Sequence, residues 1–248
     1  TGGFATRAVS LDSLAGSTSA PTIAKQIMVS DRDRHIIAFG CDTEANPGVQ
    51  DPLAIRFSSQ ESLTDWATTT ANTAGELRLG SGSEIVAAVE TRQQILVYTD
   101  ESLYAMQFLG PPFTFGVNLV SENITTMGPL SAVAVEDNVF WMGLKEFYVY
   151  GGTVQRLPCS VRDFVFDDFN LLQREKIVAA TNTAFSEIWW FYPSASSDNN
   201  DRYVVYNYEQ KVWYYGSLAR SFWMDRGIFD NPIAAGPNNY LYTQESGF

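Results

Sequence analysis

The chain has 248 residues, of which 45% are hydrophobic and 14% aromatic, so it is long enough to bury a full core. Its formal net charge is −12 and its Lys and Arg residues form no cluster, which argues against a surface that binds nucleic acid. No apolar run reaches the roughly 18 residues of a membrane span, so we expect none.

The ends of the chain indicate a piece of a longer polypeptide. It begins Thr1-Gly-Gly-Phe4, without an initiator Met or a signal-peptide pattern, and it stops at Phe248 directly after an expected strand. We expect residues 1–34 to form an N-terminal extension or connection. Residues 35–248 are expected to form one β-propeller-like domain, whose first, diverged blade contains Ile36–Gly40 and Leu53–Phe57.

A strand-rich unit recurs every ~45 to 50 residues, the period of blades in a β-propeller. The copies share one pattern and cover residues 85–108, 130–150, 177–208 and 232–243. Leu103-Tyr104 and Phe147-Tyr148 are offset by 44 residues without a gap. This repeat predicts a scaffold of antiparallel hairpins.

Each copy places a strand of small residues before an aromatic one. The small residues are Ala87, Ala132, Ala179 and Ala234. A narrow inner strand followed by wider outer strands fits the taper of a propeller blade. We therefore predict an all-β propeller-like fold, with a β-sandwich of evenly spaced hairpins as the alternative.

Two further patterns concern local structure. Asp167–Lys176 is the one stretch with helical spacing, enough for a turn or two of helix. The aromatic groups Trp213–Tyr215 and Phe222-Trp223 are expected at turns, where they pack between blades.

Nucleophilic catalysis would have to use His35, because the chain has one histidine. It stands beside Arg32, Asp33 and Arg34 without a Gly-x-Ser-x-Gly signature, so we interpret it as a blade-edge residue. Cys41 and Cys159 are a single pair 118 residues apart, which provides neither a disulfide framework nor a metal motif. We expect two free, partly buried thiols.

Acidic residues raise the possibility of a glycosidase, which needs two carboxylates ~5 to 10 Å apart. The candidates are Asp100, Glu101, Glu136, Asp137, Asp163, Asp167, Asp168 and Glu187. Most stand where β-turns favour Asp. Glu187, directly before Ile188-Trp189-Trp190, either faces the propeller axis or ends a turn.

Three loop motifs resemble ligand sites but lack parts of them. Ser197–Asp201 has oxygen donors without the Gly and distal Glu of a calcium loop, so we expect a solvated hairpin tip. Gly80–Ser83 lacks the Gly-Lys-Ser/Thr of a phosphate loop and predicts a turn. Asn123–Thr125 is a glycosylation sequon, relevant only to a secreted chain. We expect no catalytic residue, no cofactor and no metal.

Residues 35–248 resemble tail structural proteins of tailed bacteriophages, most closely the tail nozzle or tubular tail protein of short-tailed phages. The similarity rests on the order and spacing of many weak motifs. These are Arg56–Ser58, Glu61 and Trp66 in an Asp-box-like turn, Gly80–Ser83, Ile85–Ala88, Val97–Tyr104, Val139–Gly143, Phe147–Gly152, Glu187–Tyr192 and Tyr203–Trp213.

The resemblance implies a virion component, not an enzyme, assembled in the host cytoplasm as a hexameric ring around the DNA exit channel. Its partners would be other copies, the adaptor and tail fibres. DNA would only pass through, and an acidic wall would repel phosphate. A carbohydrate-active or carbohydrate-binding propeller is the alternative function, and a cellular protein-interaction propeller is a third.

Overall fold

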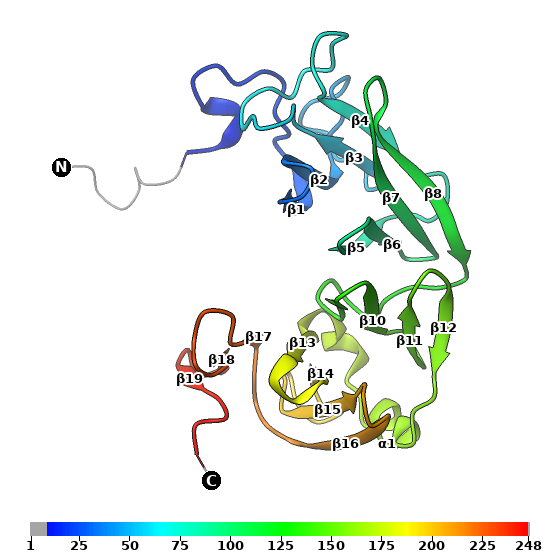
Figure 1. Ribbon diagram of the computed structural model, residues 1–248, viewed down its shortest axis with the longest axis vertical. Helices are drawn as coiled ribbons and strands as arrows, with labels where there is room; N and C mark the ends of the chain where they lie inside the picture. The colour runs from blue at the N-terminus through cyan, green and yellow to red at the C-terminus, as the bar shows by residue number, and fades with distance from the viewer. Residues whose placement is uncertain (1–8, 248) are drawn as a thin grey trace, which may run out of the picture. The chain divides into compact units, whose positions relative to one another are not determined.

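The computed structural model describes residues 9–247 and shows an almost entirely β structure with five antiparallel sheets (Figure 1). The chain divides between Ile124 and Thr125 into two compact units. We call them unit 1 and unit 2 and describe each by itself. Within residues 9–247, no helix has both the length and the apolar character needed to cross a membrane.

Unit 1 contains a short 3-10 helix, η2 (Leu11–Ser13), and two four-stranded sheets. The strands of the first sheet are β1 (Ala24–Ser30), β2 (His35–Cys41), β3 (Ala54–Phe57) and β4 (Gly75–Arg78). Those of the second sheet are β5 (Ile85–Glu90), β6 (Ile95–Thr99), β7 (Ser102–Gly110) and β8 (Thr114–Glu122).

Unit 2 contains three sheets. The third sheet has β9 (Ala132–Val135), β10 (Asn138–Met142), β11 (Phe147–Tyr150) and β12 (Val154–Leu157). The fourth has β13 (Val178–Asn182), β14 (Glu187–Tyr192), β15 (Arg202–Asn207) and β16 (Val212–Ser217). The fifth has β17 (Phe222–Met224), β18 (Ile233–Ala235) and β19 (Leu241–Thr243). The helices are α1 (Arg162–Asp167), η3 (Leu171–Lys176) and η4 (Thr183–Phe185).

Every sheet is a meander in which strands pair in chain order. In unit 1, β1 contacts β5; in unit 2, β13 contacts both β9 and β17. Within each unit, the first strands of neighbouring sheets therefore lie beside one another, as the inner strands of propeller blades do. These observations confirm the all-β prediction of repeated antiparallel blades, and they do not match the two facing sheets of a sandwich.

The first sheet starts at Ala24 rather than at the expected domain start, residue 35. Strand β1 pairs in register with β2 from Ala24↔Cys41 to Ser30↔His35. The sequence pattern did not reveal β1, because Lys25 and Gln26 break the small-residue signature of the other first strands. Residues 1–8 of the expected extension, and Phe248 at the other end, lie outside the described residues.

The last copy of the repeat begins earlier than expected. Pro232–Gly236 was expected to supply its first strand, but β18 is the middle strand and β17 precedes it. The aromatic pair Phe222-Trp223 therefore lies in a strand, and Trp213–Tyr215 lies in β16. The expected helical stretch is confirmed in part: Leu171–Lys176 is 3-10 helical, and Asp167 ends α1.

Most of the core lies between neighbouring sheets. We call each of these buried interfaces a seam. The seam of unit 1 joins aliphatic residues of both sheets, among them Ile37, Ile55, Ile95 and Met106. The seam of the fourth and fifth sheets is built on Trp189, Phe191 and Trp223. Side chains of alternate residues face each seam because strands have a two-residue period.

Candidate functional site

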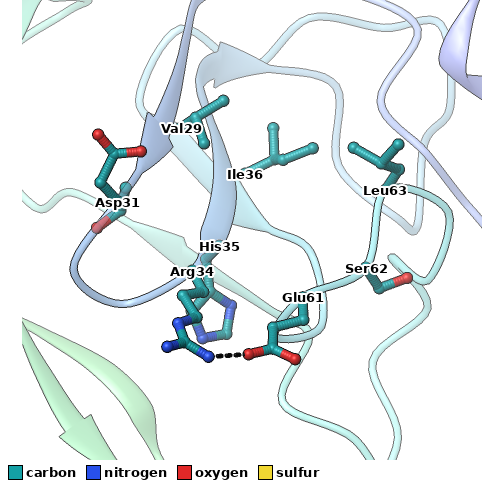
Figure 2. A pocket seen from close by; sticks show the side chains of 9 residues that line it. Val29, Asp31, Arg34, His35, Ile36, Glu61, Ser62 and Leu63 are labelled. Carbon is teal, nitrogen blue, oxygen red and sulfur yellow. Dashed lines mark hydrogen bonds and ion pairs between the residues drawn. The ribbon is translucent and has the colours of Figure 1, made fainter.

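A pocket of about 290 Å³ lies at the end of the first sheet, beside the turn that joins β1 and β2 (Figure 2). Val29 and Ile36 face the same side because they pair across the two strands, and Leu63 completes the apolar wall. Figure 2 shows these three side chains on one side of the pocket and Arg34 with Glu61 on the other. The pocket is thus mainly apolar, with a charged rim.

The charged rim of this pocket is an ion pair between Arg34 Nη1 and Glu61 Oε1. Both residues have positive φ (58° and 59°), and the Glu61 N–H donates to the Arg34 carbonyl over 2.8 Å. Because both side chains are more than half exposed, the pair contributes little stability and mainly orders the rim. No sequence pattern predicts this pairing, because 27 residues separate Arg34 from Glu61.

His35 is buried on the other side of β2 from Ile36. Its Nδ1 donates to the Ser58 carbonyl over 2.6 Å, and its ring lies 5.1 Å from Phe115 and 6.2 Å from Phe57. Burial lowers the pKa of His35, against opposing effects of the Ser58 bond and Asp33. Nε2 has no hydrogen-bond partner among the described residues. His35 therefore forms no Ser-His or Cys-His dyad there.

The two cysteines are free, as predicted. Burial raises the pKa of Cys41 to about 12 and that of Cys159 to about 11. Cys41 is fully buried beside Trp66, and its Sγ lies 3.6 Å from the Ala38 carbonyl. Since the thiolate is the nucleophile, neither residue is suited to covalent catalysis.

Glu187 begins β14 and is held by its own sheet. Its Oε2 accepts from Trp189 Nε1 over 2.9 Å, and its Oε1 accepts from the Tyr214 hydroxyl. Asn182 Nδ2 lies 3.5 Å from Glu187 Oε2 and 3.3 Å from Glu245 Oε1. The structure thus brings together Glu187 and Glu245, a partner that the sequence analysis missed because 58 residues separate them.

The other acidic candidates do not gather around Glu187. Asp100 accepts from Ser83 N over 2.7 Å and from Ser83 Oγ over 2.5 Å. Burial raises the pKa of Asp100, but these bonds outweigh it and the net shift is downward. Glu101, Glu136 and Asp137 occupy turns as predicted, whereas Asp163 and Asp167 lie in α1. Asp168 follows α1 and lies 3.5 Å from Arg202 Nε.

The loop motifs act as local structure. Asp201 closes the 194–201 loop by accepting from Ser194 N and Oγ, both over 2.8 Å. Asn200 is buried rather than solvated, because its Nδ2 donates to the carbonyls of Lys176 and Arg220. Gly82, in the predicted turn, has φ +101°, and a Cβ there would lie 2.5 Å from Thr99 Oγ1.

The predicted Asp-box-like turn has a packing role. Trp66 is buried against Ile36 and Ala54 on the outer face of the first sheet, and its Nε1 donates to the Leu63 carbonyl over 2.9 Å. Asn123 of the sequon has φ 55° directly after β8. Across residues 9–247, no three His, Cys, Asp or Glu side chains are placed to share a metal ion.

No family model and no curated protein matches the chain. Among solved structures, the N-terminal domain of Nup159 is similar at 8% identity, covering 79% of this chain and 44% of that chain, with a TM-score of 0.42. The extracellular domain of BT4673 from B. thetaiotaomicron is similar at 8% identity, covering 95% of this chain and 33% of that chain, with a TM-score of 0.48. The chain spans less than half the length of either structure. At these TM-scores the likeness carries no argument about function.

Proposed function

We propose that the chain is a non-catalytic structural component of a phage tail, a nozzle or hub, that forms part of the DNA-ejection conduit. It would assemble with copies of itself in a hexameric ring within the virion and offer a platform for the adaptor and fibres. The observation that carries the assembly part is a pair of uncovered apolar sheet faces, one on the first sheet and one on the fifth.

The first open face consists of Ile27, Val29 and Leu63, and it borders the part of the same side of the sheet where Trp66 covers Ile36. Ile27 pairs with Ala38 and Val29 with Ile36, so these side chains share one side of the first sheet. Ile27, Val29 and Leu63 are 56%, 61% and 60% exposed. The opposite side of the same sheet is buried in the seam of unit 1.

The last open face consists of Phe222, Met224, Ile233, Ala235 and Leu241. The pairs Phe222↔Ala235, Met224↔Ile233 and Ala235↔Leu241 place them on one side of the fifth sheet. Phe222, Met224 and Leu241 are 52%, 43% and 76% exposed, whereas Trp223 and Ala234 on the other side are buried. Contiguous exposed apolar surface of this kind is typical of contact sites between proteins.

Two further observations support a structural role. The candidate catalytic side chains hold turns and strands together: His35 bonds a carbonyl, and Glu187 accepts from Trp189 and Tyr214. The net charge of −12 gives the repulsion that lets DNA slide past a wall without adhering.

Particle imaging of the source assembly tests the proposal. A six-fold ring of this chain on a DNA-containing particle is the expected result. A monodisperse monomer that binds or cleaves glycans would overturn it and favour the alternative function, a carbohydrate-active or carbohydrate-binding propeller. That alternative is supported by the proximity of Glu187 and Glu245 beside the aromatic side chains of the fourth sheet.

A further inference from the structure

The fifth sheet has a free edge. Among residues 9–247 it has three strands, whereas each of the other four sheets has four. Its last strand, β19, pairs with β18 along one edge, and no described strand pairs with the other edge (Figure 1). All three residues of β19 are exposed, and Leu241 is 76% exposed.

Hydrogen bonds at the two ends of β19 show which way its backbone groups point. The Tyr240 carbonyl and the Gln244 N–H bond to the chain on the β18 side, over 2.9 and 2.8 Å. Backbone groups of an antiparallel strand alternate between its two edges, so those of Leu241 and Thr243 point to the free edge. The one contact printed there is weak, from Ser246 Oγ to the Thr243 carbonyl over 3.5 Å.

This edge lacks the features that keep other strands away. Natural proteins block free edges with charged residues, Pro or a β-bulge. The sequence Leu241-Tyr242-Thr243 contains no charge and no Pro, and its register with β18 is continuous. An edge of this kind is a template for an added strand, which binds through main-chain hydrogen bonds.

A cation without a carboxylate partner lies beside the same strand. The Arg220 guanidinium carbon is 4.6 Å from the centroid of the Tyr242 ring, and Nη2 donates to Gln244 Oε1 over 3.2 Å. Arg220 Nε is buried and has no hydrogen-bond partner among the described residues, where Arg220 also forms no ion pair. In a chain of net charge −12, this is a local site for a carboxylate.

We propose that β19 accepts an extended segment of a partner protein as a fourth antiparallel strand, with an apolar residue opposite Leu241 and an acidic residue opposite Tyr242. Directly opposed side chains have Cβ atoms about 4.5–5.5 Å apart, so a Glu opposite Tyr242 reaches the cation on that ring. The apolar residue continues the last open face. Strand addition uses the edge of the sheet, so it does not depend on the proposed ring.

Fluorescence anisotropy of a labelled, end-capped peptide, Thr-Val-Glu-Val-Thr, tests the proposal on the whole chain. In the proposed register the two Val residues lie opposite Leu241 and Thr243, and Glu lies opposite Tyr242. We expect saturable binding. Methylating the amide nitrogens of both Val residues should abolish binding, because these N–H groups donate to β19.

Thr243→Pro removes an outward N–H and leaves the hydrogen bonds to β18 in place, since edge strands tolerate Pro where the N–H faces solvent. It should weaken binding about tenfold, the effect of one lost hydrogen bond. Thr243→Ala is the matched control, because it keeps the N–H. Near-ultraviolet circular dichroism checks both folds, and the methylated peptide decides if Thr243→Pro unfolds.

Arg220→Gln tests the acidic residue of the partner. Replacing the peptide's Glu by Gln should weaken binding to the wild type about fivefold and leave binding to the Arg220→Gln protein unchanged. An equal loss in both proteins would overturn the assignment of a carboxylate opposite Tyr242.

The remaining outcomes test the strand addition itself. Equal affinity of the methylated and unmethylated peptides, or of the Thr243→Pro and Thr243→Ala proteins, would overturn it. Absence of saturable binding would overturn it too, and a lower mass of the Thr243→Pro protein in solution would then identify a second copy of the chain as the occupant of the edge.

Discussion

The seam of unit 1 and the seam between the fourth and fifth sheets join blades of the same topology by different chemistry. In unit 1, the Gln26 side chain forms the pair of hydrogen bonds with Ala88 that a neighbouring strand would form. Its Nε2 donates to the Ala88 carbonyl and its Oε1 accepts from the Ala88 N–H, both over 2.9 Å. Ser30 donates to Glu90 over 2.6 Å in the same seam. Polar groups therefore align the inner strands β1 and β5.

In unit 2, indole rings align the sheets. Trp223 stacks on Trp189 with a centroid distance of 5.4 Å and an interplanar angle of 14°, and lies 5.7 Å from Phe191. Its Nε1 donates to the Thr181 carbonyl over 2.9 Å. The comparison shows that sheets of the same topology can be joined by different interactions. Directional hydrogen bonds fix the register of the inner strands in unit 1, and buried aromatic surface holds the fourth and fifth sheets together.

The largest predicted effect is at the aromatic seam. Trp223→Ala should cost about 3–5 kcal/mol of unfolding free energy, because a buried indole is replaced by a cavity. Urea denaturation measures the loss. Phe222→Ala, one residue away on the open face, should cost under about 1 kcal/mol. Equal losses for the two variants would show that the fifth sheet is not held by Trp223.

At the polar seam, Gln26→Ala should cost about 1–3 kcal/mol, because both backbone groups of Ala88 lose their partner. Urea denaturation again gives the value, and amide exchange at Ala88 should accelerate. Gln93→Ala serves as control, since Gln93 is exposed in the turn after β5. An unchanged exchange rate at Ala88 would contradict the role given to Gln26.

The pH dependence of stability should come from unit 1. Burial lowers the pKa of His35, so the unfolded chain binds the proton more readily than the folded one. Stability is therefore full above about pH 6.5 and declines as the pH falls below it. His35→Phe should flatten the unfolding free energy between about pH 7 and pH 5. A wild-type profile that is already flat there would contradict this assignment.

The smallest effect concerns the thiols, one in each unit. With pKa values of about 12 and about 11, Cys41 and Cys159 should both react slowly with a disulfide reagent in the folded protein. Cys159 is half-buried and should react first, whereas fully buried Cys41 should react only on unfolding. Rapid labelling of Cys41 in native protein would show that the first sheet opens.

The repeat was predictable from sequence because small residues precede aromatic ones in most copies. Strands β5, β9 and β13 carry Ala87, Ala132 and Ala179 where the pattern placed them. The pattern failed at β1 and β17, the first strands of the terminal sheets. β1 alternates exposed Lys25, Ile27 and Val29 with inward residues, and β17 has only three residues.

The contacts that define the candidate sites were beyond the reach of sequence patterns. Arg34 forms an ion pair with Glu61, and both residues have a positive φ. Asn182 contacts Glu245, which lies 63 residues later in the chain. Such pairs depend on how sheets pack, whereas strand periodicity reports only which face a residue occupies. The sequence drew attention to Glu187, but its hydrogen bonds with Trp189 and Tyr214 became visible only in the structure.

The mass of the protein in solution, measured by native mass spectrometry, tests most directly whether the open faces assemble copies of the chain. We predict a multi-subunit ring for the wild type and for Leu172→Glu, a control at a 93% exposed residue of η3. Leu241→Glu places a charge on the last open face and should yield monomer. A wild-type protein that is itself monomeric, or a Leu241→Glu protein with the wild-type mass, would contradict the account.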